Sequence, residues 1–212
     1  DMNYEDFSFK VDDKDNSLSI QKNKRLKSHV IVEECMLLAN KLASEKMLES
    51  VSDHKHLGVY RNHESPSLKS INFIEEMMVH LNHYSSRNNL SASDINNFLN
   101  KFKSGSNYDA LCILIMRKMK KASYSSKSLG HYGLGFPNYV HFTSPIRRYS
   151  DLMVHRILKG IKIENHSIIT ALKDCNKGEL RSQLAERDYH KLKSLRWLDS
   201  VRDKTLKGHI ID

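Results

Sequence analysis

Apolar residues recur along this chain mainly at spacings of three and four, which predicts a mostly helical protein. Only 8 glycines and 3 prolines interrupt the 212 residues, which favours long helices over many turns. We expect helices over residues 29–49, 65–85, 91–102 and 111–122, a helix that begins at residue 145, and a last helix over 178–203. A hairpin over 6–21, around the turn residues DDKDN, and a short strand near 57–60 make the expected fold class α+β, predominantly helical.

The most informative segment covers residues 141–158, with the sequence HFTSPIRRYSDLMVHRIL. Ser144 followed by Pro145 is typical of a helix N-cap and first helical residue, because proline needs no helical N–H partner there. Arg147 and Arg148 then fall in the first turn, where free N–H groups and guanidinium groups together favour binding of an oxyanion. The apolar positions of this helix predict one buried stripe: Ile146, Tyr149, Met153 and Ile157.

The expected helix over residues 29–49 carries two adjacent acidic residues, Glu33 and Glu34, between apolar neighbours. Adjacent residues on a helix point about 100° apart, so these two carboxylates cannot share one task and one of them faces outward. The apolar positions expected on the buried side of this helix include Val30, Cys35, Leu38 and Leu42.

The composition describes a basic protein without membrane or export signals. A net charge of +9 and a pI near 9.4 favour binding to polyanions. No apolar run is long enough to cross a bilayer, and the N-terminus lacks a signal-peptide pattern, so we expect a cytoplasmic protein. Cys35, Cys112 and Cys175 match no disulfide or metal pattern, and we expect reduced thiols in the core.

The twelve histidines do not form a recognised metal-binding pattern. His80 and His83 share a helical face, as do His29 and Glu33, but neither pair has converging Cys or His partners. We expect His141 and His155 to orient the helix that follows Pro145 and the neighbouring loops. The acidic residues near the hairpin are expected to be turn residues rather than metal ligands: Asp1, Glu5, Asp6, Asp12, Asp13 and Asp15.

Several segments of this sequence resemble the ribonuclease II/ribonuclease R family. The run HYGLGFPNYVHFTSPIRRYSDLMVHR, residues 131–156, is similar to the signature near the end of that family's RNB catalytic domain. Residues 28–47, 58–67 and 184–198 resemble other family segments in the same order, and their spacing favours the ribonuclease R branch. The last residues, LKGHIID, resemble the first strand of an S1 RNA-binding domain. The resemblance implies the C-terminal half of an RNB domain over 1–205 and the start of a truncated S1-like domain over 206–212.

The resemblance implies part of a hydrolytic, processive 3′-to-5′ exoribonuclease that degrades single-stranded RNA to nucleoside monophosphates. Family members hold Mg²⁺ with a cluster of four aspartates, which this chain lacks, so the ligands are expected in a missing N-terminal half of the domain. We therefore expect this chain alone to be inactive. The alternative is a non-catalytic RNA-binding or scaffold protein that retains the helical part of the fold.

The family pattern also implies roles for individual residues. Arg147 would clamp the scissile phosphate, and its alternative is an ion pair with Asp151, one helical turn away. Glu33 would accept from the ribose 2′-OH at the RNA 3′ end, or be a solvated surface acid. Further RNA contacts are expected from Ser144, from Glu186 and from Arg148, which could equally be a solvated residue on the flank of the helix. Tyr60 and Arg61 could line the RNA channel, or instead pack and pair locally. Rings near the signature could stack on bases, although most are expected in the core: Tyr132, Tyr139, Phe142 and Tyr149.

Overall fold

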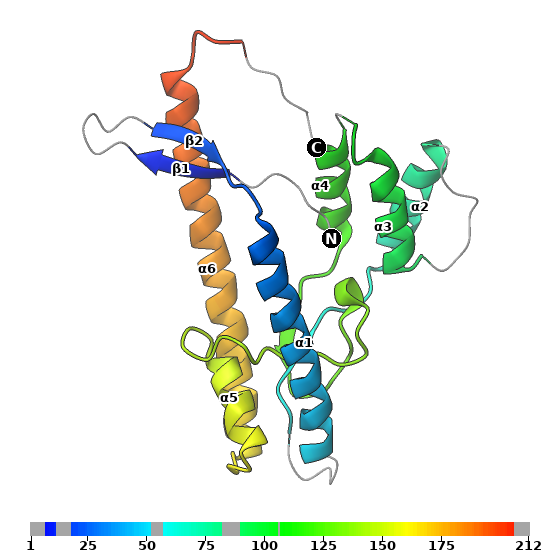
Figure 1. The fold of residues 1–212 in the computed structure, drawn as a ribbon, viewed down its shortest axis with the longest axis vertical. Helices are drawn as coiled ribbons and strands as arrows, with labels where there is room; N and C mark the ends of the chain where they lie inside the picture. Colours follow the sequence, from blue (N-terminus) through cyan, green and yellow to red (C-terminus); the bar gives the residue numbers. More distant parts are fainter. Residues whose placement is uncertain (1–6, 12–17, 52–56, 82–89, 106, 206–212) are drawn as a thin grey trace. The chain divides into compact units, whose positions relative to one another are not determined.

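The computed structural model describes residues 7–11, 18–51, 57–81, 90–105 and 107–205 (Figure 1). Its elements follow in the order β1 (Phe7–Val11), β2 (Leu18–Lys22), α1 (Lys27–Ser50), β3 (Tyr60–Asn62), α2 (Leu68–His80), α3 (Ala92–Phe102), α4 (Tyr108–Lys118), β4 (Ser123–Ser125), the 3₁₀ helix η1 (Tyr132–Leu134), α5 (Tyr149–Leu158) and α6 (Asn165–Ser200). The predominantly helical α+β fold is confirmed. Residues 206–212, where the S1-like strand is expected, lie outside the described residues, so the division at residue 205 stays a prediction.

The chain forms two compact units, and α2 and α6 each contribute residues to both. The first unit comprises residues 1–25, 72–118 and 180–212, and the second comprises residues 26–71 and 119–179. The segment that resembles the family signature lies entirely in the second unit.

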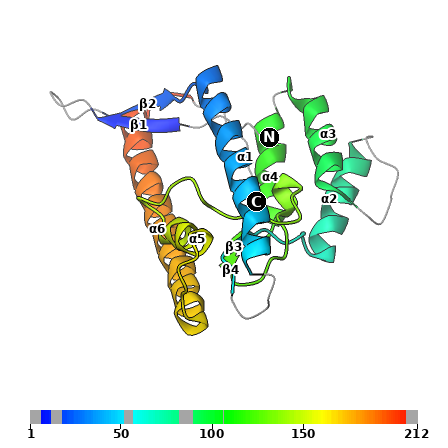
Figure 2. The ribbon, with the colours of Figure 1, turned by 60° about the horizontal axis from the view of Figure 1, so that its bottom comes forward.

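In the first unit, β1 and β2 form the predicted antiparallel hairpin, in which Phe9 is opposite Ile20. Phe9 also contacts the ring of His190 on α6, with ring centroids 5.9 Å apart. Helices α2, α3 and α4 lie side by side in both views (Figures 1 and 2). Their core includes fully buried apolar side chains: Ile74, Met78, Phe98, Cys112 and Ile115.

The predicted cap of α3 is confirmed. The Ser91 hydroxyl accepts from the Asp94 backbone N–H at 3.2 Å, and the Asp94 carboxylate accepts from the Ser91 backbone N–H at 2.9 Å. This reciprocal pair satisfies backbone donors that a helix leaves unpaired at its N-terminus.

In the second unit, α1 packs against α5, and the buried face of α1 differs from the predicted one. Asn40, Ala43, Ser44 and Met47 are buried, whereas the apolar positions expected in the core are exposed: Val30, Cys35, Leu38 and Leu42. Apolar residues occur on several sides of α1, so their spacing does not select one face. The buried face combines Asn40 and Ser44, which contact the loop over residues 138–142, with Ala43 and Met47, which belong to the hydrophobic core of this unit. The expectation that all three cysteines are core thiols is therefore wrong for Cys35. Cys112 is buried and Cys175 is partly buried.

Strand β3 pairs antiparallel with β4, with Arg61 opposite Tyr124 (Figure 2). The sequence predicts β3 slightly too early and does not predict β4, which is only three residues long. Asn176 on α6 fixes β4, because its side chain accepts from the Tyr124 N–H at 2.8 Å and donates to the Tyr124 carbonyl at 2.9 Å.

Helix α6 begins at Asn165, earlier than the predicted start near residue 178. Its first turns bury Ile168 and Leu172 in the core of the second unit. Gly178, at which the expected helix starts, lies in the interior of α6, because the packing of these earlier turns outweighs the low helix propensity of glycine.

Candidate functional site

The segment that resembles the family signature enters α5 through a turn. The Ser144 carbonyl oxygen accepts from the backbone N–H groups of Arg147 (3.3 Å) and Arg148 (3.0 Å). Arg148 has an extended backbone, with φ −122° and ψ 116°, and α5 begins after it at Tyr149. The predicted helix start at Pro145, with Ser144 as its cap, is wrong because the extended Arg148 separates this turn from the helix.

The buried face of α5 also differs from the predicted stripe. Ile146 and Tyr149 are exposed, while Met153 is buried and Ile157 is partly buried. Because the helix starts four residues later than predicted, Ile146 belongs to the turn and does not share a helical face with the others.

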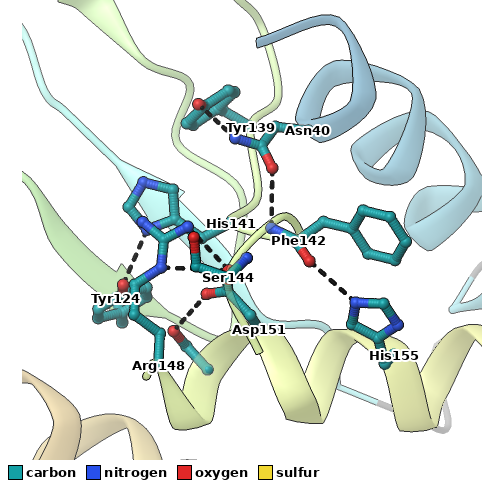
Figure 3. Close-up of polar contacts among 10 residues, drawn as sticks. Asn40, Tyr124, Tyr139, His141, Phe142, Ser144, Arg148, Asp151 and His155 are labelled. Carbon is teal, nitrogen blue, oxygen red and sulfur yellow. Dashed lines mark hydrogen bonds and ion pairs between the residues drawn. The ribbon is translucent and has the colours of Figure 1, made fainter. Parts of the chain in front are cut away.

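Asp151 holds the turn in place from inside the protein. Its side chain is fully buried, and its Oδ2 atom accepts from the Ser144 backbone N–H at 2.8 Å (Figure 3). The same oxygen accepts from Nε and Nη2 of Arg148, at 3.1 and 2.8 Å, and Oδ1 accepts from the Ser150 hydroxyl at 3.2 Å. The predicted hydroxyl cap is absent from α5, and Asp151, the third residue of the helix, instead fixes the backbone of Ser144 and the side chain of Arg148.

The two adjacent arginines have different environments. The alternative ion pair between Arg147 and Asp151 is wrong, because Arg148 makes the pair with Asp151. Arg147 is exposed on the turn, and in the described part of the chain no ion pair involves it. The turn therefore presents one arginine at the surface while the next is fixed to a buried carboxylate.

His141 and His155 orient the signature loops, as predicted. His155 Nε2 lies 2.9 Å from the Phe142 carbonyl oxygen, and its ring stacks on Phe142 with centroids 4.0 Å apart. His141 Nδ1 lies 2.8 Å from the Tyr124 hydroxyl. Each histidine ties one part of the loop before α5 to a neighbouring element (Figure 3).

Helix α1 is joined to this loop by Asn40, which is 3% exposed. Its Nδ2 donates to the Tyr139 hydroxyl and its Oδ1 accepts from the Phe142 backbone N–H, each at 2.8 Å (Figure 3). The Ser44 hydroxyl, one turn further along α1, lies 2.7 Å from the Lys41 carbonyl oxygen of its own helix and 3.2 Å from the Asn138 carbonyl oxygen. The buried face of α1 thus contacts the loop at Asn138, Tyr139 and Phe142.

A pocket of about 390 Å³ lies between α1 and the loop. Glu33 and Arg148 are both among its lining residues, which are His29, Val32, Glu33, Met36, Leu37, Asn40, Tyr139, His141 and Arg148. Glu33 and Glu34 are both exposed, so exposure does not distinguish the two carboxylates, but of the two Glu33 alone is among the pocket-lining residues. The structure therefore brings together an acidic and a basic candidate that are more than one hundred residues apart in the sequence.

Tyr60 and Arg61 pack and pair locally. Tyr60 is a core residue, and the Arg61 guanidinium forms a two-pronged ion pair with Glu179 at 2.6 and 2.7 Å. Arg61 also lies over the Tyr124 ring, 4.6 Å from its centroid. These contacts agree with the alternative that Tyr60 and Arg61 pack and pair locally instead of contacting RNA.

The remaining candidates are more dispersed. Glu186 is exposed on the part of α6 that belongs to the first unit. Of the rings near the signature, Tyr139 is buried, Tyr132 and Phe142 are partly buried, and Tyr149 is half exposed. The acidic residues around the hairpin turn, and His83, lie outside the described residues.

The described residues do not supply a metal centre of the kind that the resemblance implies. Within them, no group of three or more His, Cys, Asp or Glu side chains converges to hold an ion. Asp151 is occupied by its own hydrogen bonds and ion pair. These residues therefore do not fit a carboxylate-bound Mg²⁺.

Two histidines beside the pocket are held neutral. Burial lowers the pKa of His141 to about 3, with further contributions from Arg148 and Arg61. Burial also lowers the pKa of His131 to about 4, helped by the neighbouring His63 and Arg61. His131, Tyr139, His141 and Tyr124 form a continuous series of edge-to-face rings, with neighbouring centroids 5.2 to 5.7 Å apart.

Acidification is expected to destabilise the chain through His141. The pKa of His141 is lower in the folded than in the unfolded state, so its contribution to the free energy of unfolding is complete above about pH 6.5 and is lost as the pH falls toward 3. Between pH 7 and pH 4.5 the free energy of unfolding should fall by on the order of 2 kcal/mol. Urea unfolding should show a weaker pH dependence for His141→Gln, whose amide can accept from Tyr124 without titrating. His166→Gln, at an exposed position, should keep the original dependence. Equal pH dependence in all three proteins would contradict this account.

Sequence reasoning missed the role of Asn40 and assigned Asp151 the wrong partner. The available signal for Asn40 was its position seven residues after Glu33, which places both on one side of a helix. For Asp151, the signal was an acidic residue three positions after Arg148 in the first turn of α5.

The described helices include none that is both long and apolar enough to span a membrane.

The sequence profile of the RNB domain family matches residues 1–164 of this chain. The chain therefore belongs to the RNB domain family. The curated relatives include Ribonuclease R of Buchnera aphidicola, 36% identical over 151 residues that make up 71% of this chain and 20% of the relative. Ribonuclease R of Helicobacter pylori is 31% identical over 201 residues, which cover 91% of this chain and 31% of the relative. The chain thus spans less than a third of the length of these relatives.

Solved structures of Mycoplasma genitalium RNase R have the same fold. The complex with double-stranded RNA matches all of this chain and 40% of its own, with a TM-score of 0.83 and 26% identity. The complex with ribose-methylated single-stranded RNA matches 93% of this chain and 32% of its own, with a TM-score of 0.78 and 26% identity.

Proposed function

We propose that this chain is the RNA-holding part of a cytoplasmic, hydrolytic exoribonuclease of the ribonuclease R kind. The enzyme would degrade single-stranded RNA processively from the 3′ end and release nucleoside monophosphates. The observation that carries the proposal is the turn over residues 144–148, in which buried Asp151 fixes the backbone and Arg148 while Arg147 stays exposed. An exposed guanidinium on a turn whose backbone is fixed in this way is suited to bind a phosphate.

In this proposal, Arg147 contacts the phosphate to be cleaved and Glu33 accepts from the ribose 2′-OH of the terminal nucleotide. Glu33 lines the pocket between α1 and the loop, and a carboxylate there would favour RNA over DNA. Arg148 and Ser144 support the turn, and Glu186 would contact the terminal nucleotide. Tyr60 and Arg61 would stabilise the strand behind the loop.

The catalytic Mg²⁺ is proposed to be held by residues outside this chain, in another part of the RNB domain, with an S1 domain as a further RNA-binding part. Sequencing the coding DNA upstream of the codon for Asp1 tests this assignment. An in-frame cluster of four closely spaced aspartates would support the exoribonuclease. A start codon at Met2 would instead favour the non-catalytic RNA-binding protein.

RNA binding by the 212-residue chain tests the proposed grip directly. We expect fluorescence anisotropy to show tighter binding to a 5′-labelled single-stranded RNA than to the same DNA sequence, with affinity that falls steeply with salt. Blocking the RNA 3′ end with a bulky group should weaken binding. Equal affinity for RNA and DNA, with or without the block, would contradict a 3′-end grip.

A further inference from the structure

The feature that carries this inference is the double hydrogen bond of Asn40. Its side chain is 3% exposed and contacts the loop at two points, the Tyr139 hydroxyl and the Phe142 backbone N–H. Both distances are 2.8 Å, so the amide group uses its donor and its acceptor at the same time. Asn40 therefore fixes the separation between α1 and the loop.

This separation is also the width of the pocket. Glu33 lies on the α1 side of the pocket, while Tyr139, His141 and Arg148 lie on the loop side. Asn40 is part of the lining itself and lies two helical turns from Glu33. A change in the position of the loop relative to α1 would therefore change the space between Glu33 and Arg148.

We propose that Asn40 is a positioning residue that sets the width of the pocket between Glu33 and the loop, and thereby the preference for a ribose with a 2′-OH at the RNA 3′ end. The inference rests on the proposed function, because it concerns the sugar that Glu33 contacts. Arg147 is held separately, through the turn that Asp151 fixes. Loss of Asn40 should therefore weaken sugar discrimination without removing the phosphate contact.

The chain contains a matched control for this effect. Asn62 is also buried and also makes two hydrogen bonds, donating to the Lys127 carbonyl at 2.8 Å and accepting from the Leu129 N–H at 3.0 Å. It is not among the residues that line the pocket. A substitution of Asn62 removes a comparable pair of contacts from the same unit and leaves the contacts of Asn40 in place.

The test compares two 5′-fluorescein-labelled RNAs that differ only in the 3′-terminal sugar, which is ribose in one and 2′-deoxyribose in the other. A hydrogen bond from the 2′-OH to a carboxylate should make the wild-type chain bind the ribose end about 10-fold more tightly. In Asn40→Ala the ratio of the two dissociation constants, deoxyribose-ended over ribose-ended RNA, should fall from about 10 to below about 2. The affinity for the deoxyribose-ended RNA should not change. In Asn62→Ala the wild-type ratio should persist.

Tyr139→Phe keeps the test decisive if Asn40→Ala does not fold. It removes only the hydroxyl that Asn40 contacts and keeps a ring between His131 and His141. For Tyr139→Phe the ratio of the two dissociation constants should be lower than the wild-type value and higher than one. A wild-type ratio in folded Asn40→Ala, or in Tyr139→Phe, would overturn the positioning role of Asn40. A ratio of one in the wild-type chain would instead overturn the proposed ribose contact, and with it this inference.

Discussion

Replacement of Asp151 by alanine is expected to lower the free energy of unfolding by about 3–5 kcal/mol. The Asp151 side chain is fully buried and that of Arg148 is 21% exposed, so the substitution leaves a poorly solvated guanidinium without its partner. It also removes the acceptor of the Ser144 backbone N–H and of the Ser150 hydroxyl. Urea unfolding followed by circular dichroism measures the loss.

The exposed pair of Asp199 and Arg202 provides the control. It has the same residue types at the same spacing of three, but its side chains are 68% and 79% exposed. Solvent screens such a pair, so Asp199→Ala should cost less than about 1 kcal/mol. Similar losses in the two variants would show that burial of Asp151 does not determine the stability of the turn.

If the proposed function is correct, Arg147→Ala should reduce turnover of the complete exoribonuclease by about 10²- to 10³-fold, which is typical when a group that stabilises transition-state charge is removed. Arg147 is exposed and lies outside the buried network of Asp151, so the unfolding free energy should not change. RNA degradation is measured under single-turnover conditions with a 5′-labelled substrate. In the 212-residue chain itself, the same substitution should weaken RNA binding.

Arg156→Ala is the matched control, because it removes an exposed arginine from the last turn of α5 and keeps the turn over residues 144–148 intact. Its turnover should stay within about threefold of the wild type. Unchanged turnover in Arg147→Ala would exclude Arg147 from the mechanism, and an equal loss in both variants would indicate a general charge effect.

Local sequence signals predicted many of the elements. The β1–β2 hairpin follows from its Asp-rich turn, and α3 follows from the Ser91–Asp94 cap, because both signals are formed by neighbouring residues. The membership of the RNB family was also predicted, from the signature over residues 131–156. The roles of Arg147, Glu33 and Glu186 in RNA contact stay predictions.

Features that depend on distant contacts were not predicted. Helix α1 has apolar residues on several sides, and only its packing against α5 and the loop over residues 138–142 determines that Asn40 and Ser44 are buried while Leu38 and Leu42 are exposed. The start of α5 at Tyr149 depends on the contacts of Asp151, which compete with the local preference of Ser144 and Pro145 to begin a helix.

The contacts of Asn40 also have a consequence for synthesis on the ribosome. Its two partners follow it by 99 and 102 residues in the sequence. At a translation rate of about 5–20 residues per second, α1 is made roughly 5–20 seconds before the loop that it binds. During that interval the amide of Asn40 lacks both of its final partners, so this wall of the pocket is completed only after the loop has been translated.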